Sequence, residues 1–158
     1  LWIETQNALV VFDPQRGEAI DRLRIPGGVF GVTSTPSGLW GVAGQAEQVV
    51  QIDPASRRIV GRVDLEGPLG GLAVDGDQIW TVAARSALVR IDPRTNRISA
   101  VIDVGEKPAG VAVAGNTAWV YNLGDGTVSQ IDASANAGGR RSPGAVSAGS
   151  QASSSVGL

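Results

Sequence analysis

Short apolar runs, alternating with polar residues or rich in β-branched residues, follow one another along most of the chain. In one stretch they cover residues 71–74, 78–82, 87–91 and 97–104. This period of two and these lengths predict β-strands, and no segment carries the 3.6-residue period of a helix. Asp75-Gly76-Asp77 and the segment 92–96 separate the runs with Gly, Pro and Asn, which favour tight turns. The pattern therefore predicts four antiparallel strands in about 40 residues.

This unit recurs at a nearly constant interval. Asp residues return after 40, 39 and 40 positions, and Trp residues after 38, 40 and 39. A Gly follows each of the first three Asp residues by 18 positions and precedes the next Trp by 9, so only the interval from Trp to Asp varies, between 11 and 13. The recurring residues are Asp13, Asp53, Asp92, Asp132, Trp2, Trp40, Trp80, Trp119, Gly31, Gly71 and Gly110. A period of this length indicates a repeat architecture.

Repeated four-stranded antiparallel units of this size are typical of the blades of a β-propeller. We therefore expect an all-β chain whose residues 1–132 form a partial propeller, with blade parts 1–25, 26–65, 66–104 and 105–132. Two of these blades are expected to be full and two partial. Because propellers close with about 4 to 8 blades, we expect a fragment with apolar faces exposed at both ends.

The recurring residues are expected to serve the fold. The Gly column suits an innermost strand near a central channel, where a side chain would not fit. The Trp column is expected to pack between neighbouring blades. Each Asp begins a turn and can accept backbone N–H groups, which argues against a catalytic role.

Several sequence segments resemble the YVTN-type β-propeller repeat family, and the resemblance covers residues 1 to about 135. They are Ile91–Ile98, Pro108–Val113, Trp119–Asn122 and Asp125–Asp132. The chain departs from the usual pattern at Tyr121, where a small residue is common, and at Ala133, where Pro is common. The Gly-His and Trp-Asp signatures of WD40 repeats do not occur. The resemblance implies a propeller that is part of a larger bacterial protein. It also implies an extracytoplasmic localisation: secreted, periplasmic or at the cell surface.

The pattern stops after Asp132. Residues 133–158 contain seven Ser, five Gly and six Ala, a composition that cannot bury enough apolar surface to become ordered. We expect a flexible Ala/Gly/Ser-rich tail at 133–158, and a disrupted fourth blade is the alternative.

Composition excludes several kinds of chemistry. The chain has no Cys, His or Met, so it has no thiol or imidazole for nucleophilic catalysis, general-base catalysis or metal binding. The net charge is −2 without a basic stripe, so no nucleic-acid partner is expected. No apolar run of about 18 residues predicts a membrane span. We therefore assign no catalytic residue, no metal and no cofactor.

The loops of variable length are expected to open together on one edge, because alternate connections of a meander lie on the same side. Function tends to lie on variable loops of a rigid scaffold. The residues predicted to contact a ligand or partner are Arg85, Glu106, Lys107, Asn122 and Asp125.

Two functions fit these observations. The first is a non-catalytic binding or scaffold module for a protein or small-molecule ligand, with the remaining propeller blades as a further partner. The alternative is a fragment of a streptogramin-lyase-like or lactonase-like propeller enzyme whose catalytic residues lie in missing blades. Those families resemble this chain in their repeats but require a His or a cluster of acidic and amide ligands, and a quinoprotein-like propeller would require a Trp-docking repeat.

Overall fold

The computed structural model describes residues 1–83 and 86–134, and these form four antiparallel sheets of three or four strands. The first sheet contains β1 (Trp2–Thr5), β2 (Ala8–Asp13) and β3 (Glu18–Arg24). The second contains β4 (Phe30–Thr35), β5 (Gly38–Ala43), β6 (Gln48–Asp53) and β7 (Arg58–Asp64). The third contains β8 (Leu69–Asp75), β9 (Gln78–Ala83), β10 (Ala87–Asp92) and β11 (Arg97–Asp103). The fourth contains β12 (Pro108–Ala114), β13 (Thr117–Asn122) and β14 (Thr127–Asp132).

The chain is therefore all-β, as the alternating pattern predicts. The only helical segment among the described residues is a short 3-10 turn, η1 (Gly44–Ala46). Every strand pairs with the next strand of its own sheet, so each sheet is a simple meander. The four strands expected within 71–104 are β8 to β11, each within a few residues of its predicted position.

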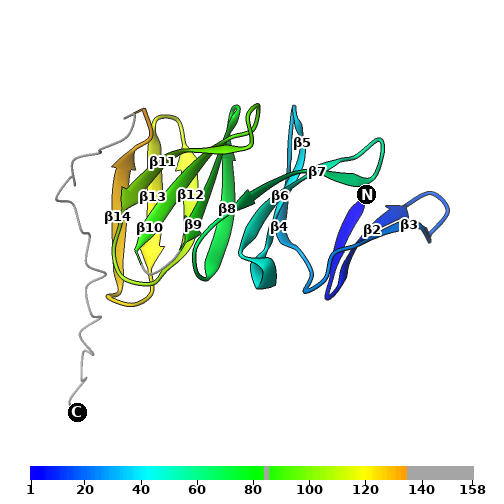
Figure 1. Cartoon of the computed structure of the whole chain (residues 1–158), viewed down its shortest axis with the longest axis horizontal. Coiled ribbons are helices and arrows are strands. Elements are labelled where there is room, and N and C mark those ends of the chain that lie inside the picture. Colours follow the sequence, from blue (N-terminus) through cyan, green and yellow to red (C-terminus); the bar gives the residue numbers. More distant parts are fainter. Residues whose placement is uncertain (84–85, 135–158) are drawn as a thin grey trace, which may run out of the picture.

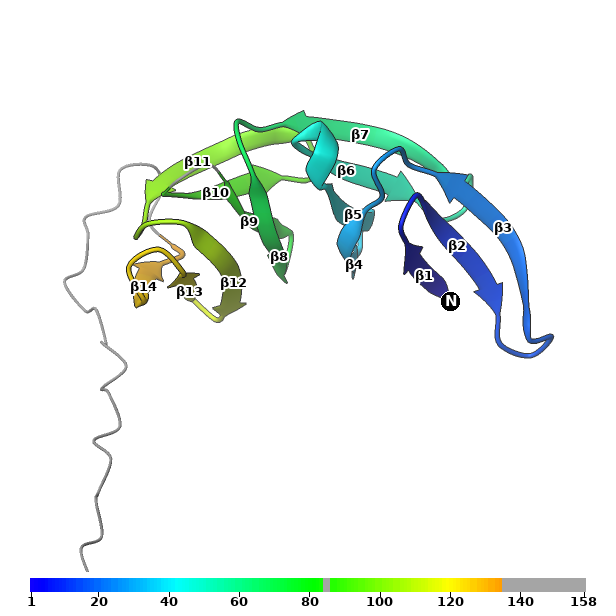
Figure 2. The ribbon, with the colours of Figure 1, turned by 90° about the horizontal axis from the view of Figure 1, so that it is seen from below.

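The sheets stand side by side along an open arc (Figures 1 and 2). Figure 2 shows β4, β8 and β12 on the inner side of the arc and β3, β7 and β11 along its outer side. The strand that begins each unit is thus the innermost one, and the strand that ends it faces outward. A register shift lies at the same repeat position in three sheets, between Val11 and Phe12, Gln51 and Ile52, and Arg90 and Ile91. Such a bulge increases the local twist of the outer strand.

Three apolar clusters fill the spaces between successive sheets. Trp40 lies between the second and third sheets with Ile79 and Ile91, and Trp80 lies between the third and fourth with Val120. Trp2 is only partly buried, against the cluster between the first and second sheets. Trp119 is 39% exposed, which differs from the expectation for its column. The reason is that no described sheet follows the fourth one to cover it.

The recurring glycines were expected to lie where no side chain fits. At two of them, however, the space would accept a methyl group. A Cβ added to Gly71 would lie 3.6 Å from the Cα of Gly110, which is ordinary contact, and one added to Gly110 would meet nothing within 4 Å. Gly31 instead needs its glycine for conformation, since its φ is +63°. The crowded position is Gly70, where a Cβ would overlap the Val82 side chain and the Ala109 carbonyl.

The recurring Asp residues organise the turns between the third and fourth strands of their units. Their Oδ1 atoms accept the N–H of the residue two positions later at 2.9–3.0 Å: Gln15, Ala55, Arg94 and Ser134. Hydrogen bonds from Ser56 and from the Ala55 N–H hold the pKa of Asp53 below its usual value, and the Ser134 hydroxyl does the same for the pKa of Asp132. These carboxylates are therefore used within their own turns.

Candidate functional site

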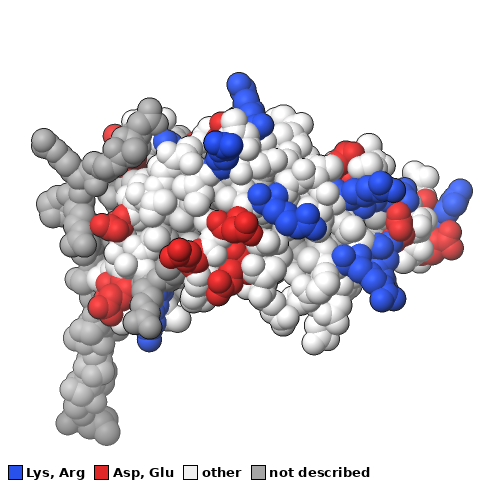
Figure 3. All heavy atoms as spheres, viewed as in Figure 1, with Lys and Arg blue, Asp and Glu red and all other residues white. Residues whose placement is uncertain are grey.

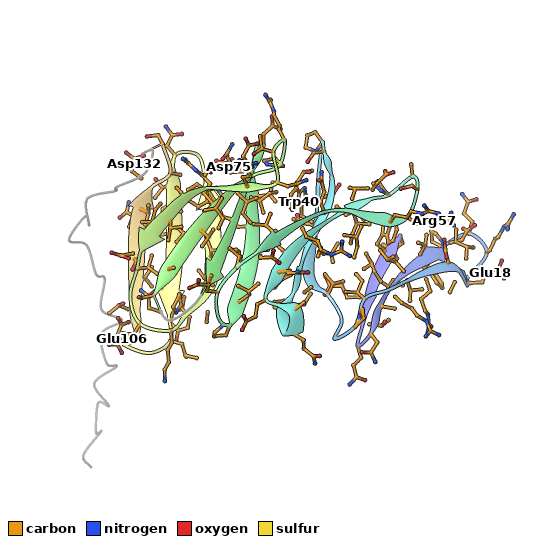
Figure 4. All side chains as sticks on the ribbon, in the orientation of Figure 1. Glu18, Trp40, Arg57, Asp75, Glu106 and Asp132 are labelled. Carbon is orange, nitrogen blue, oxygen red and sulfur yellow. The ribbon has the colours of Figure 1, made fainter. Side chains whose placement is uncertain are left out.

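Two kinds of connection meet at one edge of the arc. In three successive units, the residue that follows the outermost strand donates its N–H to the turn between the second and third strands. These bonds are Ile25 to Asn7, Leu65 to Glu47 and Val104 to Ser86, at 2.9–3.0 Å between N and O. We call this side the loop edge, defined by residues 6–7, 25–29, 44–47, 65–68, 86, 104–107 and 123–126. In Figure 4 the labelled Glu106 lies on this edge, opposite the labelled Asp75 and Asp132.

Within the loop edge, the connection between the first two sheets packs tightly against the turn between β1 and β2. Gly28 has a φ of +76°, and its N–H donates to the Ile25 carbonyl at 2.8 Å. A Cβ at Gly28 would lie only 2.5 Å from the Gln6 carbonyl oxygen. The close approach of two backbones therefore requires glycine here.

The fourth sheet brings three predicted contact residues together. The turn after β13 lies against the connection that leads into β12. The N–H groups of Leu123 and Gly124 donate to the carbonyls of Lys107 and Glu106 at 3.0 and 2.9 Å. In return, the Glu106 N–H donates to the Asp125 carboxylate at 3.0 Å. Glu106, Lys107 and Asp125 are all exposed on the loop edge, and Lys107 has a φ of +49°.

The Asp125 carboxylate fixes the shape of this turn. It accepts the Thr127 hydroxyl at 2.6 Å and the Thr127 N–H at 3.1 Å, besides the Glu106 N–H. The Thr127 hydroxyl and then the Glu106 N–H hold the pKa of Asp125 below its usual value. A carboxylate that stays ionised and is bound to three donors is suited to holding a loop rather than to transferring protons.

Asn122 is not a surface contact, which corrects the sequence prediction. It is fully buried, with 0% of its surface exposed. Its Nδ2 donates to the hydroxyls of Thr127 and Ser129 at 3.0 and 2.9 Å, while Oδ1 is buried without a partner among the described atoms. The Asn side chain occupies the repeat position of Ala43 and Ala83, which also face inward. Its role is to support the loop from beneath.

One exposed residue of the loop edge escaped the sequence analysis. Leu123 is 62% exposed beside Glu106, in a turn otherwise made of Gly and Asp. No signal in the sequence marks it, because single exposed apolar residues are common on protein surfaces. The remaining predicted contact, Arg85, lies outside the described residues.

The described residues contain no group of three or more acidic, His or Cys side chains that could hold a metal ion. An open depression on the opposite edge is lined by Asn116, Thr117, Gln130, Asp132 and Ser134. Its only ionisable group, Asp132, is bound within its own turn. Within the part of the chain that the structure describes, no helix has the length and apolarity that a membrane crossing requires.

Comparison with known proteins shows similarity in fold alone. No family model matches the sequence, and no curated protein matches it. Among solved structures, a chain of hydrazine synthase from Kuenenia stuttgartiensis superposes with a TM-score of 0.71 at 14% identity. The match covers 89% of this chain and 45% of that one, so this chain spans less than half of the relative's length. At this identity the likeness concerns the β-rich fold and transfers no activity.

Proposed function

We propose that the four sheets are blades of a β-propeller of the YVTN type, with blade parts at 1–25, 26–65, 66–104 and 105–132. The open arc, the inner position of the first strand of each unit and the repeated Trp contacts support this assignment. The phrase Trp119–Asn122, followed by the Asp125 turn, supports the family assignment.

This propeller acts as a non-catalytic binding or scaffold module that presents its loop edge to a protein or small-molecule ligand. The observation that carries this function is the repeated backbone bond between each outer-strand end and the neighbouring turn. These bonds hold turns of unlike sequence and length on one rigid edge, which is the arrangement that binding scaffolds use. The opposite edge instead repeats one Asp turn.

The fourth sheet offers the best-defined part of this surface. Glu106 and Lys107 are exposed there on the connection into β12, and Leu123 and Asp125 on the adjacent turn, which the Asp125 carboxylate joins to Glu106. An apolar side chain beside charged groups of both signs allows contact with a polypeptide that has mixed character. Because the turn is already ordered, little conformational entropy is lost on binding.

The proposal is tested by panning a phage-displayed random peptide library against the 158-residue chain and measuring the affinity of selected peptides by calorimetry. We expect Glu106→Lys or Leu123→Asp to weaken the selected peptides on the order of tenfold, a loss of about 1.4 kcal/mol. Arg94→Glu is the matched control, because Arg94 is exposed on the opposite edge and pairs with Asp77 at 3.0 Å.

Two results would contradict the proposed function. One is a set of peptides that bind through the Asp-turn edge, recognised by sensitivity to Arg94→Glu alone. The other is that repeated selections yield no peptide whose binding is weakened by Glu106→Lys or Leu123→Asp, although circular dichroism shows that the chain is folded.

A further inference from the structure

The dipeptide Asp-Gly occurs twice in the chain, at Asp75-Gly76 and at Asp125-Gly126, and both pairs lie where two neighbouring strands are joined. Gly76 and Gly126 have φ values of +56° and +68°, and a Cβ added to either would meet nothing within 4 Å. Because glycine has no Cβ, its backbone nitrogen is open to approach by the side chain of the preceding residue. The space around the two pairs is therefore alike.

The two carboxylates differ in what holds them. The Asp125 carboxylate accepts the Thr127 hydroxyl at 2.6 Å, the Thr127 N–H at 3.1 Å and the Glu106 N–H at 3.0 Å. The Asp75 carboxylate has no hydrogen bond or ion pair within the described part of the chain. Arg94, the cation that reaches this hairpin, pairs with Asp77 instead, at 3.0 Å. The Asp75 side chain is thus free to change rotamer, whereas that of Asp125 is not.

We propose that Asp75-Gly76 is a site of spontaneous isoaspartate formation in the folded chain, and that Asp125-Gly126 is protected from it. The Gly76 nitrogen attacks the side-chain carboxyl carbon of Asp75 in its protonated form. The N–H proton leaves with the carboxyl hydroxyl as water, and a succinimide ring closes. Water then adds to the backbone carbonyl of Asp75 and opens the ring, so that the main chain continues through the former side-chain carbonyl. One water is lost and one is gained, and no other reactant is needed.

Ring closure makes two demands that the Asp125 turn opposes. The carboxyl group must be protonated, although three donors favour its ionised form, and it must rotate toward the Gly126 nitrogen, which breaks the same bonds. Asp75 is restrained only by its backbone pairing with Gln78 at the end of β8. The end of a strand opens more readily than its interior, so this restraint is the weaker one.

The reaction changes the inner strand of the third sheet and leaves the proposed binding surface untouched. It adds a methylene group to the main chain at the last residue of β8, and it places a carboxylate directly on that main chain. The pairing of Asp75 with Gln78 is therefore disturbed. In Figure 4, Asp75 lies on the edge opposite Glu106. The inference is thus independent of the proposed function, and either can fail without the other.

Peptide mapping of the 158-residue chain after incubation at mildly acidic pH tests the proposal. Isoaspartate is quantified by enzymatic methylation with isoaspartyl methyltransferase, and its position is assigned by electron-transfer fragmentation of the peptides. In the folded chain, we expect it to form about tenfold faster at position 75 than at position 125, the ratio that corresponds to one pKa unit of carboxylate stabilisation. In concentrated urea, where neither carboxylate is held, the two Asp-Gly pairs should react at similar rates.

Two variants separate the effect of the hydrogen bonds from that of the sequence. Thr127→Val removes the hydroxyl donor, so we expect isoaspartate at position 125 to rise several-fold while position 75 is unchanged. Thr117→Val, on strand β13 of the same sheet, is the matched control and should alter neither position. Asp75→Glu should abolish the signal at position 75, because the longer side chain would have to close a less favourable six-membered ring.

Circular dichroism verifies that each variant is folded. A ratio of the two rates that is the same in the folded chain as in urea would overturn the proposal. So would a folded Thr127→Val variant in which position 125 reacts no faster than in the parent.

Discussion

Arg57 joins the first two sheets: its Nη1 donates to Oδ2 of Asp21 at 2.8 Å. Arg57 lies four residues after Asp53 and has a φ of +56°, which directs its side chain back to outer strand β3. The same relationship recurs one unit later, where Asn96 has a φ of +52° and lies against Gly61, the counterpart of Asp21. The left-handed residues of the second and third Asp turns, Arg57 and Asn96, thus lie against the outer strand of the preceding sheet.

The Asp21 contact predicts how stability depends on pH. The hydrogen bond from Arg57, followed by the Arg22 N–H, lowers the pKa of Asp21 from its ordinary value of 3.8. A depressed folded-state pKa stabilises the fold above the unfolded value, and this contribution is lost as pH falls through the folded pKa. We expect Asp21→Asn to reduce the decline in the free energy of unfolding as the pH falls below about 4.

Urea unfolding monitored by tryptophan fluorescence at several pH values measures this effect. Glu18→Gln, an exposed carboxylate at the start of the same strand, is the control and should leave the decline close to that of the parent. An Asp21→Asn curve parallel to the parent curve would show that the ion pair does not contribute.

Two glycines should differ in how much stability is lost when alanine replaces them. Gly28→Ala places a methyl group 2.5 Å from the Gln6 carbonyl oxygen at a φ of +76°, so we expect a loss of about 2 kcal/mol or more. Gly110→Ala meets nothing within 4 Å, so we expect a change within about 0.5 kcal/mol. Urea denaturation measures both. An equal loss in both variants would mean that glycine is needed along the inner strand regardless of space.

The alternating pattern was sufficient to predict the strands, because each sheet buries alternate residues against its neighbour. It also placed Glu106, Lys107 and Asp125 on one edge, since the parity of connections in a meander follows from strand order alone. The division of the chain into blades and the identity of the ligand remain proposals.

The burial of Asn122 was not predictable from polarity. An Asn at the end of a strand ordinarily indicates an exposed turn, and only its alignment with Ala43 and Ala83 hints that the position faces inward. The exposure of Trp119 likewise depends on what covers the fourth sheet rather than on its own repeat. Sequence spacing identifies a column, whereas burial depends on the neighbouring sheet.

Trp80 should be among the most sensitive positions for stability. It is 1% exposed between the third and fourth sheets, and the Arg90 guanidinium lies 5.5 Å from its ring centre. We expect Trp80→Ala to cost about 3–5 kcal/mol because it leaves a large cavity and removes the cation–π contact. Val101→Ala, at an exposed site, should change stability by less than about 0.5 kcal/mol. Calorimetric melting of both variants checks the difference, and a small loss at Trp80 would contradict the packing between these sheets.

Asn122→Asp should produce a stability defect that acid reverses. The substitution keeps the size of the side chain but places a carboxylate in a site with 0% exposure. Burial raises the pKa of the new carboxyl in the folded state above its unfolded value, so the variant is penalised where the group must ionise. We expect a loss of about 3 kcal/mol at pH 7 that shrinks as pH falls towards about 4, where the buried carboxyl is protonated.

The measurement is the difference in unfolding free energy between variant and parent at each pH, which removes the acid sensitivity they share. Asn116→Asp, in an exposed turn, should show little difference from the parent at any pH. A defect at Asn122→Asp that did not change with pH would indicate lost hydrogen bonds to Thr127 and Ser129 rather than a buried charge.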